Sequence, residues 1–165
     1  MIALDILDVK SFMKQLLVEK TFDSFLLSEA TVTTFNQFYI DGALHPDFFD
    51  TDTKEQLKNR KYSYWKELRE FVFSIIKGKR TPLHFKMVFQ LPHTQIVSFL
   101  QFSNLEYEET EIQGLFFNLL FDGHKLTCTT GTSQKHFTMD RTIDNAWDLY
   151  VMSYFKNNGI STEKL

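Results

Sequence analysis

Apolar and polar residues alternate with two different periods along this chain, and each period predicts one kind of element. Alternation at every second position, or a run rich in Val, Ile, Thr and Phe, predicts strands over residues 2–6, 24–30, 32–41 and 83–91. Apolar positions three and four residues apart predict helices over residues 9–18, 63–77, 93–102 and 142–157. Trp147 lies on the wide apolar stripe of the last helix and is therefore predicted to pack against a sheet.

A hairpin is predicted at Asp122-Gly123, which separates the apolar run 115–121 from the half-polar run 125–130. An Asp-Gly pair between strand-like runs favours a type I′ turn, because both central residues of that turn need positive φ. Residues 137–139 are predicted to add a short third strand to this meander.

Two segments follow neither period. Residues 45–62 are polar and are expected to form a loop, with a helical turn as the alternative for 54–59, and residues 159–165 are expected to be a loose tail. The predicted order of elements is then β-α-β-β-α followed by β-α-β-β-(β)-α. This order predicts a single α+β domain, 1–165, built as a tandem pseudo-repeat with halves of about 1–80 and 81–158. The alternative fold is a two-layer α+β sheet with its helices on one face.

Composition narrows the class of protein. The chain has 165 residues, 18 of them phenylalanine, so it can bury a large core without a disulfide or metal to hold it together. Cys128 is the only cysteine, which excludes an internal disulfide and a cysteine metal cluster. The first ten residues carry acids where a signal peptide carries a basic region, and no apolar run approaches the length of a membrane span. We therefore expect a cytoplasmic protein with no membrane partner and no cofactor.

The charge is unevenly distributed. Residues 54–80 hold nine basic residues against three acidic ones, although the whole chain has a net charge of −3. This asymmetry suggests an anionic partner, and the alternative is a solvated helix face that offsets acidic neighbours. The aromatic residues Tyr62, Tyr64 and Trp65 lie within the stretch and would stack on bases, unless Trp65 belongs to the core. The candidate nucleic-acid contacts are Arg60, Lys61, Lys66, Arg69, Lys77, Lys79 and Arg80.

A second candidate site lies in the loop 45–53, which carries one histidine and three aspartates. Carboxylates beside a histidine can bind a divalent metal or perform acid–base chemistry. The spacing of His45, Asp47, Asp50 and Asp52 matches no defined metal loop, and the sequence shows no catalytic motif. A small enzyme with its site in this loop is therefore the alternative to a binding protein.

Three stretches, FDSFLLSEATVTTFNQFYIDG, FSIIKGKRTPLHFKMVFQL and GLFFNLLFDGHKLTCTTGTS, resemble a family of small bacterial proteins known only as a domain of unknown function. This resemblance covers nearly the whole chain and implies no activity.

The tandem order of elements is also similar, more distantly, to one domain of the DNA sliding clamps. The best match is strand 83–91, helix 93–102 and the run LFFNLLFDGHKLTCTTGTSQKHFTM. The resemblance implies that helices 9–18 and 93–102 lie side by side on one face of a shared sheet. The chain departs from the clamp pattern in having helices 63–77 and 142–157 and in having no basic residue in helix 93–102, which argues against encirclement of DNA.

Together these observations favour a non-catalytic binding or scaffold protein. Its partner is not specified by any motif, and the basic stretch makes nucleic acid, or an enzyme that acts on nucleic acid, the best candidate.

Overall fold

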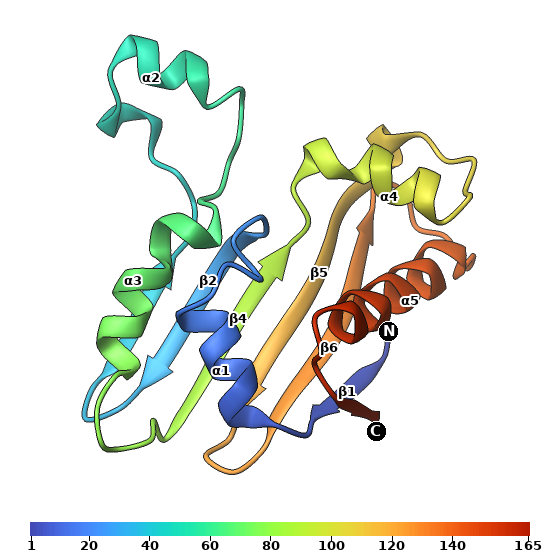
Figure 1. Ribbon diagram of the computed structural model, residues 1–165. Helices are drawn as coiled ribbons and strands as arrows, with labels where there is room; N and C mark the ends of the chain where they lie inside the picture. The colour runs from blue at the N-terminus through green and yellow to red at the C-terminus, as the bar shows by residue number, and fades with distance from the viewer.

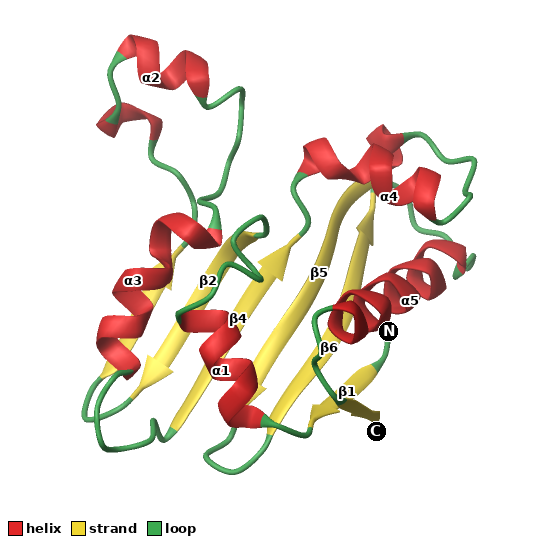
Figure 2. Cartoon of the chain, in the orientation of Figure 1, coloured by secondary structure: helices red, strands yellow, loops and turns green.

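The computed structural model describes all 165 residues and is organised around one seven-stranded antiparallel sheet (Figures 1 and 2). The strands follow the spatial order β3-β2-β4-β5-β6-β1-β7. Their bounds are β1 (Ala3–Ile6), β2 (Leu26–Thr33), β3 (Gln37–Asp41), β4 (His84–Gln90), β5 (Ile112–Phe121), β6 (Leu126–Gln134) and β7 (Thr162–Lys164). The helices are α1 (Val9–Leu17), α2 (Thr51–Gln56), α3 (Trp65–Ile76), α4 (Ile96–Phe102) and α5 (Thr142–Asn157). None of the helices is long and apolar enough to span a membrane.

The sheet is covered by helices on one face only. Helices α1, α3 and α5 lie over the same face, and α4 lies at the end of the sheet where β4 finishes (Figure 1). The opposite face carries a mostly polar row that crosses the sheet, and none of its members is buried: Tyr39, Thr31, Lys86, Leu120, Thr127, Asp5 and Glu163. The predicted class, a single α+β domain, is therefore confirmed, and its layers are those of the alternative fold.

The core between helices and sheet is built from aromatic rings. Phe22 lies at its centre, with ring centroids at 5.3 Å from Phe12, 6.0 Å from Phe117 and 6.2 Å from Phe155. Edge-to-face and offset contacts of this kind add to the free energy gained from burial. Nine of the 18 phenylalanines are buried in this core, whereas others such as Phe35 and Phe137 are exposed.

Both tryptophans are fully buried, and each has a partner for its polar atom. The indole N–H of Trp147 donates to the carbonyl of Phe116 at 2.7 Å, and that of Trp65 donates to the carbonyl of Leu16 at 2.7 Å. The predicted burial of Trp147 is confirmed. Trp65 is a core residue, so it is not available to stack on a ligand.

Three local predictions were wrong. Strand β2 continues to Thr33, across the predicted break between strands 24–30 and 32–41, because Ala30 and Val32 are buried and pair with Met87 and Phe85 of β4. Residues 137–139 form no strand. The tail is not loose, because residues 162–164 form strand β7 on the edge of β1 and Ile160 is buried. For β2 and β7, pairing and burial across the sheet outweigh the local pattern, whereas Phe137 and Met139 are exposed and pair with no strand.

The hairpin between β5 and β6 is present, but its turn differs from the predicted type I′. Only Gly123 has a positive φ, at 99°. The carboxylate of Asp122 accepts hydrogen bonds from the backbone N–H groups of His124 and Lys125, both at 2.8 Å. The bonds from Lys125 and His124 hold the pKa of Asp122 below its usual range. The turn is therefore stabilised by hydrogen bonds to the Asp122 side chain. A type I′ turn would instead need two central residues with a left-handed backbone.

Helices α1 and α4, which the clamp resemblance places side by side, do not pack against each other. Helix α1 packs beside α3, whereas α4 packs on α5 through Phe99, whose ring lies 5.7 Å from Trp147 and 5.6 Å from Tyr150. The strands before and after these helices also differ, because β4 pairs directly with β5 but three strands separate β1 from β2. The two halves share an order of elements and not a pattern of pairing.

Candidate ligand-binding pocket

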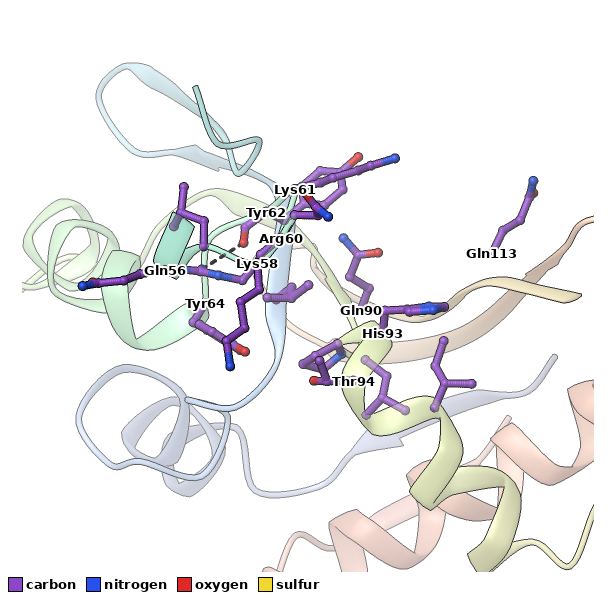
Figure 3. A pocket seen from close by; sticks show the side chains of 16 residues that line it. Gln56, Lys58, Arg60, Lys61, Tyr62, Tyr64, Gln90, His93, Thr94 and Gln113 are labelled. Atoms are coloured by element: carbon purple, nitrogen blue, oxygen red, sulfur yellow. Dashed lines mark hydrogen bonds between the residues drawn. The ribbon is translucent and has the colours of Figure 1, made fainter. Parts of the chain in front are cut away.

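A pocket of about 690 Å³ lies at the end of the sheet where β4 finishes (Figure 3). One wall is the segment 56–64, which leaves α2 and leads into α3. The other wall is the segment 90–96, which leaves β4 and leads into α4. Leu26 of β2 and Gln113 of β5 complete the lining. The pocket therefore joins parts of the chain that are about thirty residues apart in sequence.

The first wall belongs to a lobe that projects from the sheet (Figure 1). No residue of this lobe, 44–61, is buried. Its two ends are joined by a hydrogen bond from Leu44 N to the Lys61 carbonyl at 2.8 Å, and the stem is fixed to β2 at Gly42. A Cβ at Gly42 would lie 1.8 Å from the Leu27 carbonyl oxygen, so only glycine allows this close approach. The lobe is thus held at its base, directly beside the pocket.

The chain reverses direction at the pocket through two left-handed residues. Lys58 and Asn59 have φ values of 49° and 61°, in the left-handed region that residues other than glycine seldom adopt. Asparagine tolerates this conformation, but lysine gains nothing from it. Backbone strain of this kind is often found at functional sites. Its effect here is to place the side chains of residues 58–61 along the wall of the pocket.

Arg60 organises this wall. Its guanidinium donates to the Tyr62 carbonyl at 3.0 Å and to Glu67 Oε1 at 2.6 Å, and its Cζ lies 4.4 Å from the centre of the Tyr64 ring. The same Glu67 oxygen accepts the backbone N–H of Tyr64 at 2.9 Å, which caps the start of α3. Arg60 is therefore a largely structural cation whose charge is shared with Glu67.

The other cations of the pocket are free. Lys58 and Lys61 are exposed and form no ion pair, and no carboxylate lines the pocket. This is a local excess of positive charge on a chain whose net charge is −3. A concave surface with only one sign of charge attracts ligands of the opposite sign.

Gln90, the last residue of β4, places an amide in the pocket. Its side chain points toward the open space between the two walls (Figure 3), and the residue is only 8% exposed. Its Nε2 is fully buried and has no hydrogen-bond partner. An unsatisfied buried donor costs about 1–3 kcal/mol. A buried donor without a partner needs an explanation, and a ligand that supplies the missing acceptor would provide one.

The seven basic residues predicted from the sequence do not form one surface. Arg60 and Lys61 line the pocket, and Lys66 lies close by on α3, with its Nζ 5.3 Å from the centre of the Tyr64 ring. Arg69 is held by Asp23, with Nε–Oδ1 at 2.9 Å, and by the Val18 carbonyl. Lys77, Lys79 and Arg80 follow the other end of α3, which is 12 residues long and therefore spans about 18 Å.

The loop 45–53 does not bring its acidic residues together. Asp50 caps α2 by accepting the backbone N–H of Thr53 at 2.7 Å, and its hydrogen bonds with Thr53 lower its pKa. Asp47 forms a surface ion pair, with its Oδ1 3.8 Å from Nζ of Lys54. No three His, Cys, Asp or Glu residues are placed to hold a metal ion, and none of the four predicted residues lines the pocket.

The sequence pattern missed Lys58 as a pocket residue, and it also missed Gln90, His93 and Thr94. Gln90 carried no signal, because it lies in the phase of β4 that His84 and Lys86 share, where a polar residue is expected. Its burial could not be read from the strand pattern, since the facing wall comes from a distant part of the chain.

Fold and pocket together define a two-layer α+β protein with a cation-lined pocket at one end of its sheet. The chain belongs to DUF5721, a family of unknown function whose profile matches residues 15–163. This agrees with the expected membership of an uncharacterised family. No curated protein and no solved structure matches the chain, so the likeness to the DNA sliding clamps has no support beyond the order of elements.

Proposed function

We propose that this protein is a non-catalytic binding protein that holds a segment of single-stranded nucleic acid in the pocket. The observation that carries the proposal is the lining: free lysines, tyrosines and an unpartnered amide, with no carboxylate. This combination provides contacts for phosphate, for the face of a base and for the edge of a base. Phosphate contacts supply affinity, and contacts to bases select the strand.

Lys58 and Lys61 are the phosphate contacts in this proposal. Neither is committed to an acidic neighbour, so both are available to a ligand without loss of an internal ion pair. Arg60 supports them by holding the wall in place, and Lys66 adds positive charge beside Tyr64. Each phosphate neutralised by a lysine releases counterions and makes the affinity depend on salt.

Tyr62 is the stacking contact. The ring of Tyr64 is already covered by Arg60 and Lys66, whereas Tyr62 forms no cation–π or aromatic pair. A base stacked on an aromatic side chain contributes about 1–3 kcal/mol. A duplex keeps its bases stacked and paired, so only a single strand presents a base to Tyr62 and to the buried amide of Gln90.

The proposal predicts a weak, salt-dependent affinity for single strands. The dissociation constant is expected in the range of about 1–100 µM at physiological salt, and a duplex of equal length is expected to bind more weakly. Changing Lys58 and Lys61 together to alanine should reduce the slope of log K against log salt by about 1.4, since each single-strand phosphate contact contributes about 0.7. The measurement is fluorescence anisotropy of a labelled strand across a salt series.

The matched control removes more charge at the other end of α3. The triple variant Lys77→Ala, Lys79→Ala, Arg80→Ala loses three exposed cations that lie away from the pocket. Its salt slope should equal that of the wild-type protein. An equal loss of slope in both variants would show that binding is spread over the basic stretch, and no binding at low salt would remove nucleic acid as the ligand.

A further inference from the structure

We propose that Gln90 reads one unpaired base of the bound strand and that this base is adenine. The inference rests on the proposed function, because it names the ligand group that the same pocket selects. Two independent features of Gln90 support it: its place in the pocket and its missing hydrogen-bond partner.

The Gln90 side chain is poorly explained as a structural group. Four buried side-chain polar atoms in the protein lack a partner, and Nε2 of Gln90 is the one that belongs to the pocket. The neighbouring residues Leu91, Pro92 and Ile96 are buried and apolar, so they offer its amide no side-chain acceptor. A leucine would fill the same place on β4 without leaving a donor unsatisfied. The amide is therefore more useful to a ligand than to the fold.

A carboxamide presents a donor and an acceptor side by side, and a base edge with the reverse pattern forms two hydrogen bonds with it. Adenine offers such an edge twice, through its N6 amino group together with either N1 or N7. Guanine offers it on its Watson–Crick edge, whereas its Hoogsteen edge presents two acceptors and its N2–N3 edge lies beside the sugar, away from a contact made edge-first. Pyrimidines offer less surface for stacking on Tyr62. Adenine is therefore the base that Gln90 and Tyr62 accept most readily in either orientation.

The walls fit a base that enters edge-first. Gln90 lies between the two walls, with Tyr62 on one side and His93 and Thr94, both exposed, on the other (Figure 3). The lysines lie on the same wall as Tyr62, where the sugar-phosphate backbone of an inserted nucleotide would run. The apolar residues Leu91 and Pro92 beside Gln90 exclude water from the edge contacts, which strengthens them.

The test compares oligothymidine strands that carry one central adenosine, one central guanosine, one abasic site or no substitution. The wild-type protein should bind the adenosine strand at least about fivefold more tightly than the others, the range expected for one bidentate contact. Gln90→Leu should bind all four strands alike and keep the wild-type salt slope. Gln101→Leu, an exposed glutamine of α4 outside the pocket, should retain the adenosine preference.

Two failures are distinguishable. Equal wild-type affinity for all four strands, with binding still dependent on Lys58 and Lys61, would overturn base reading by Gln90 and leave the proposed function standing. Binding of none of the strands by the wild-type protein would overturn both. A Gln90→Leu variant that still prefers adenosine would also overturn the inference, because the preference would then come from another group. A thermal melt of each variant confirms that the chain is folded before titration.

Discussion

Trp147→Ala is expected to lower the free energy of unfolding by about 3–5 kcal/mol, which is a large part of the stability of an ordinary domain. The indole is fully buried between α5 and the sheet. It stacks on Tyr150 with ring centroids 5.2 Å apart, and its ring meets Phe99 of α4 edge-on. The substitution therefore leaves a cavity where three elements meet, and it removes the donor that satisfies the Phe116 carbonyl.

The measurement is equilibrium unfolding in urea, followed by circular dichroism. Leu149→Ala is the matched control, because Leu149 lies on the same helix and is 61% exposed. It should change the free energy of unfolding by no more than about 0.5 kcal/mol. Equal midpoints for Trp147→Ala and the wild-type protein would contradict the packing of α5 on the sheet.

Arg69→Ala is expected to cost about 2–4 kcal/mol of stability, because it leaves Asp23 without its partner in a largely buried site. Both side chains are less than a fifth exposed, and two nitrogens of the guanidinium contact the two oxygens of the carboxylate at 2.9 and 3.1 Å. A third guanidinium nitrogen donates to the Val18 carbonyl. Arg69 therefore fastens α3 to the segment that follows α1.

Lys66→Ala provides the control for this second substitution. Lys66 lies on the same helix, is exposed and forms no ion pair, so its loss should barely change the unfolding midpoint. The double variant Asp23→Ala, Arg69→Ala should recover part of the loss, since no unpaired charge remains in the site. If Arg69→Ala melts like the wild-type protein, the ion pair is not a structural contact and the sequence-based assignment of Arg69 to ligand binding is favoured again.

Helices and strands with strong periodicity were predictable from the sequence. The elements against which they pack or pair were not. The pattern over 142–157 indicated both the helix and the burial of Trp147, because an apolar stripe must face a core. The register of β2 and the pairing of β7 depend on contacts with β4 and β1, and a local pattern contains no information about such distant partners.

The candidate site shows the same division. The sequence indicated a basic stretch with interleaved tyrosines, which includes Arg60 and Lys61 of the pocket. It did not indicate that Lys77, Lys79 and Arg80 lie at the far end of α3 from the pocket. A count of charges along the sequence contains no information about the distance that a helix places between them. Gln90 lines the pocket only because β4 ends beside the lobe 44–61. The two segments are neighbours because β4 pairs with β2, and this strand order cannot be read from the sequence.

Photo-cross-linking tests most directly the claim that this pocket holds a single strand. A strand with photoactivatable bases is irradiated with the wild-type protein, and the linked peptides are identified by mass spectrometry. Cross-links are expected within residues 56–64 and 90–96, the two walls of the pocket, and they should be lost in the Lys58→Ala, Lys61→Ala variant. Cross-links confined to residues 77–80, or to the polar row on the sheet face without helices, would contradict binding of the strand in the pocket.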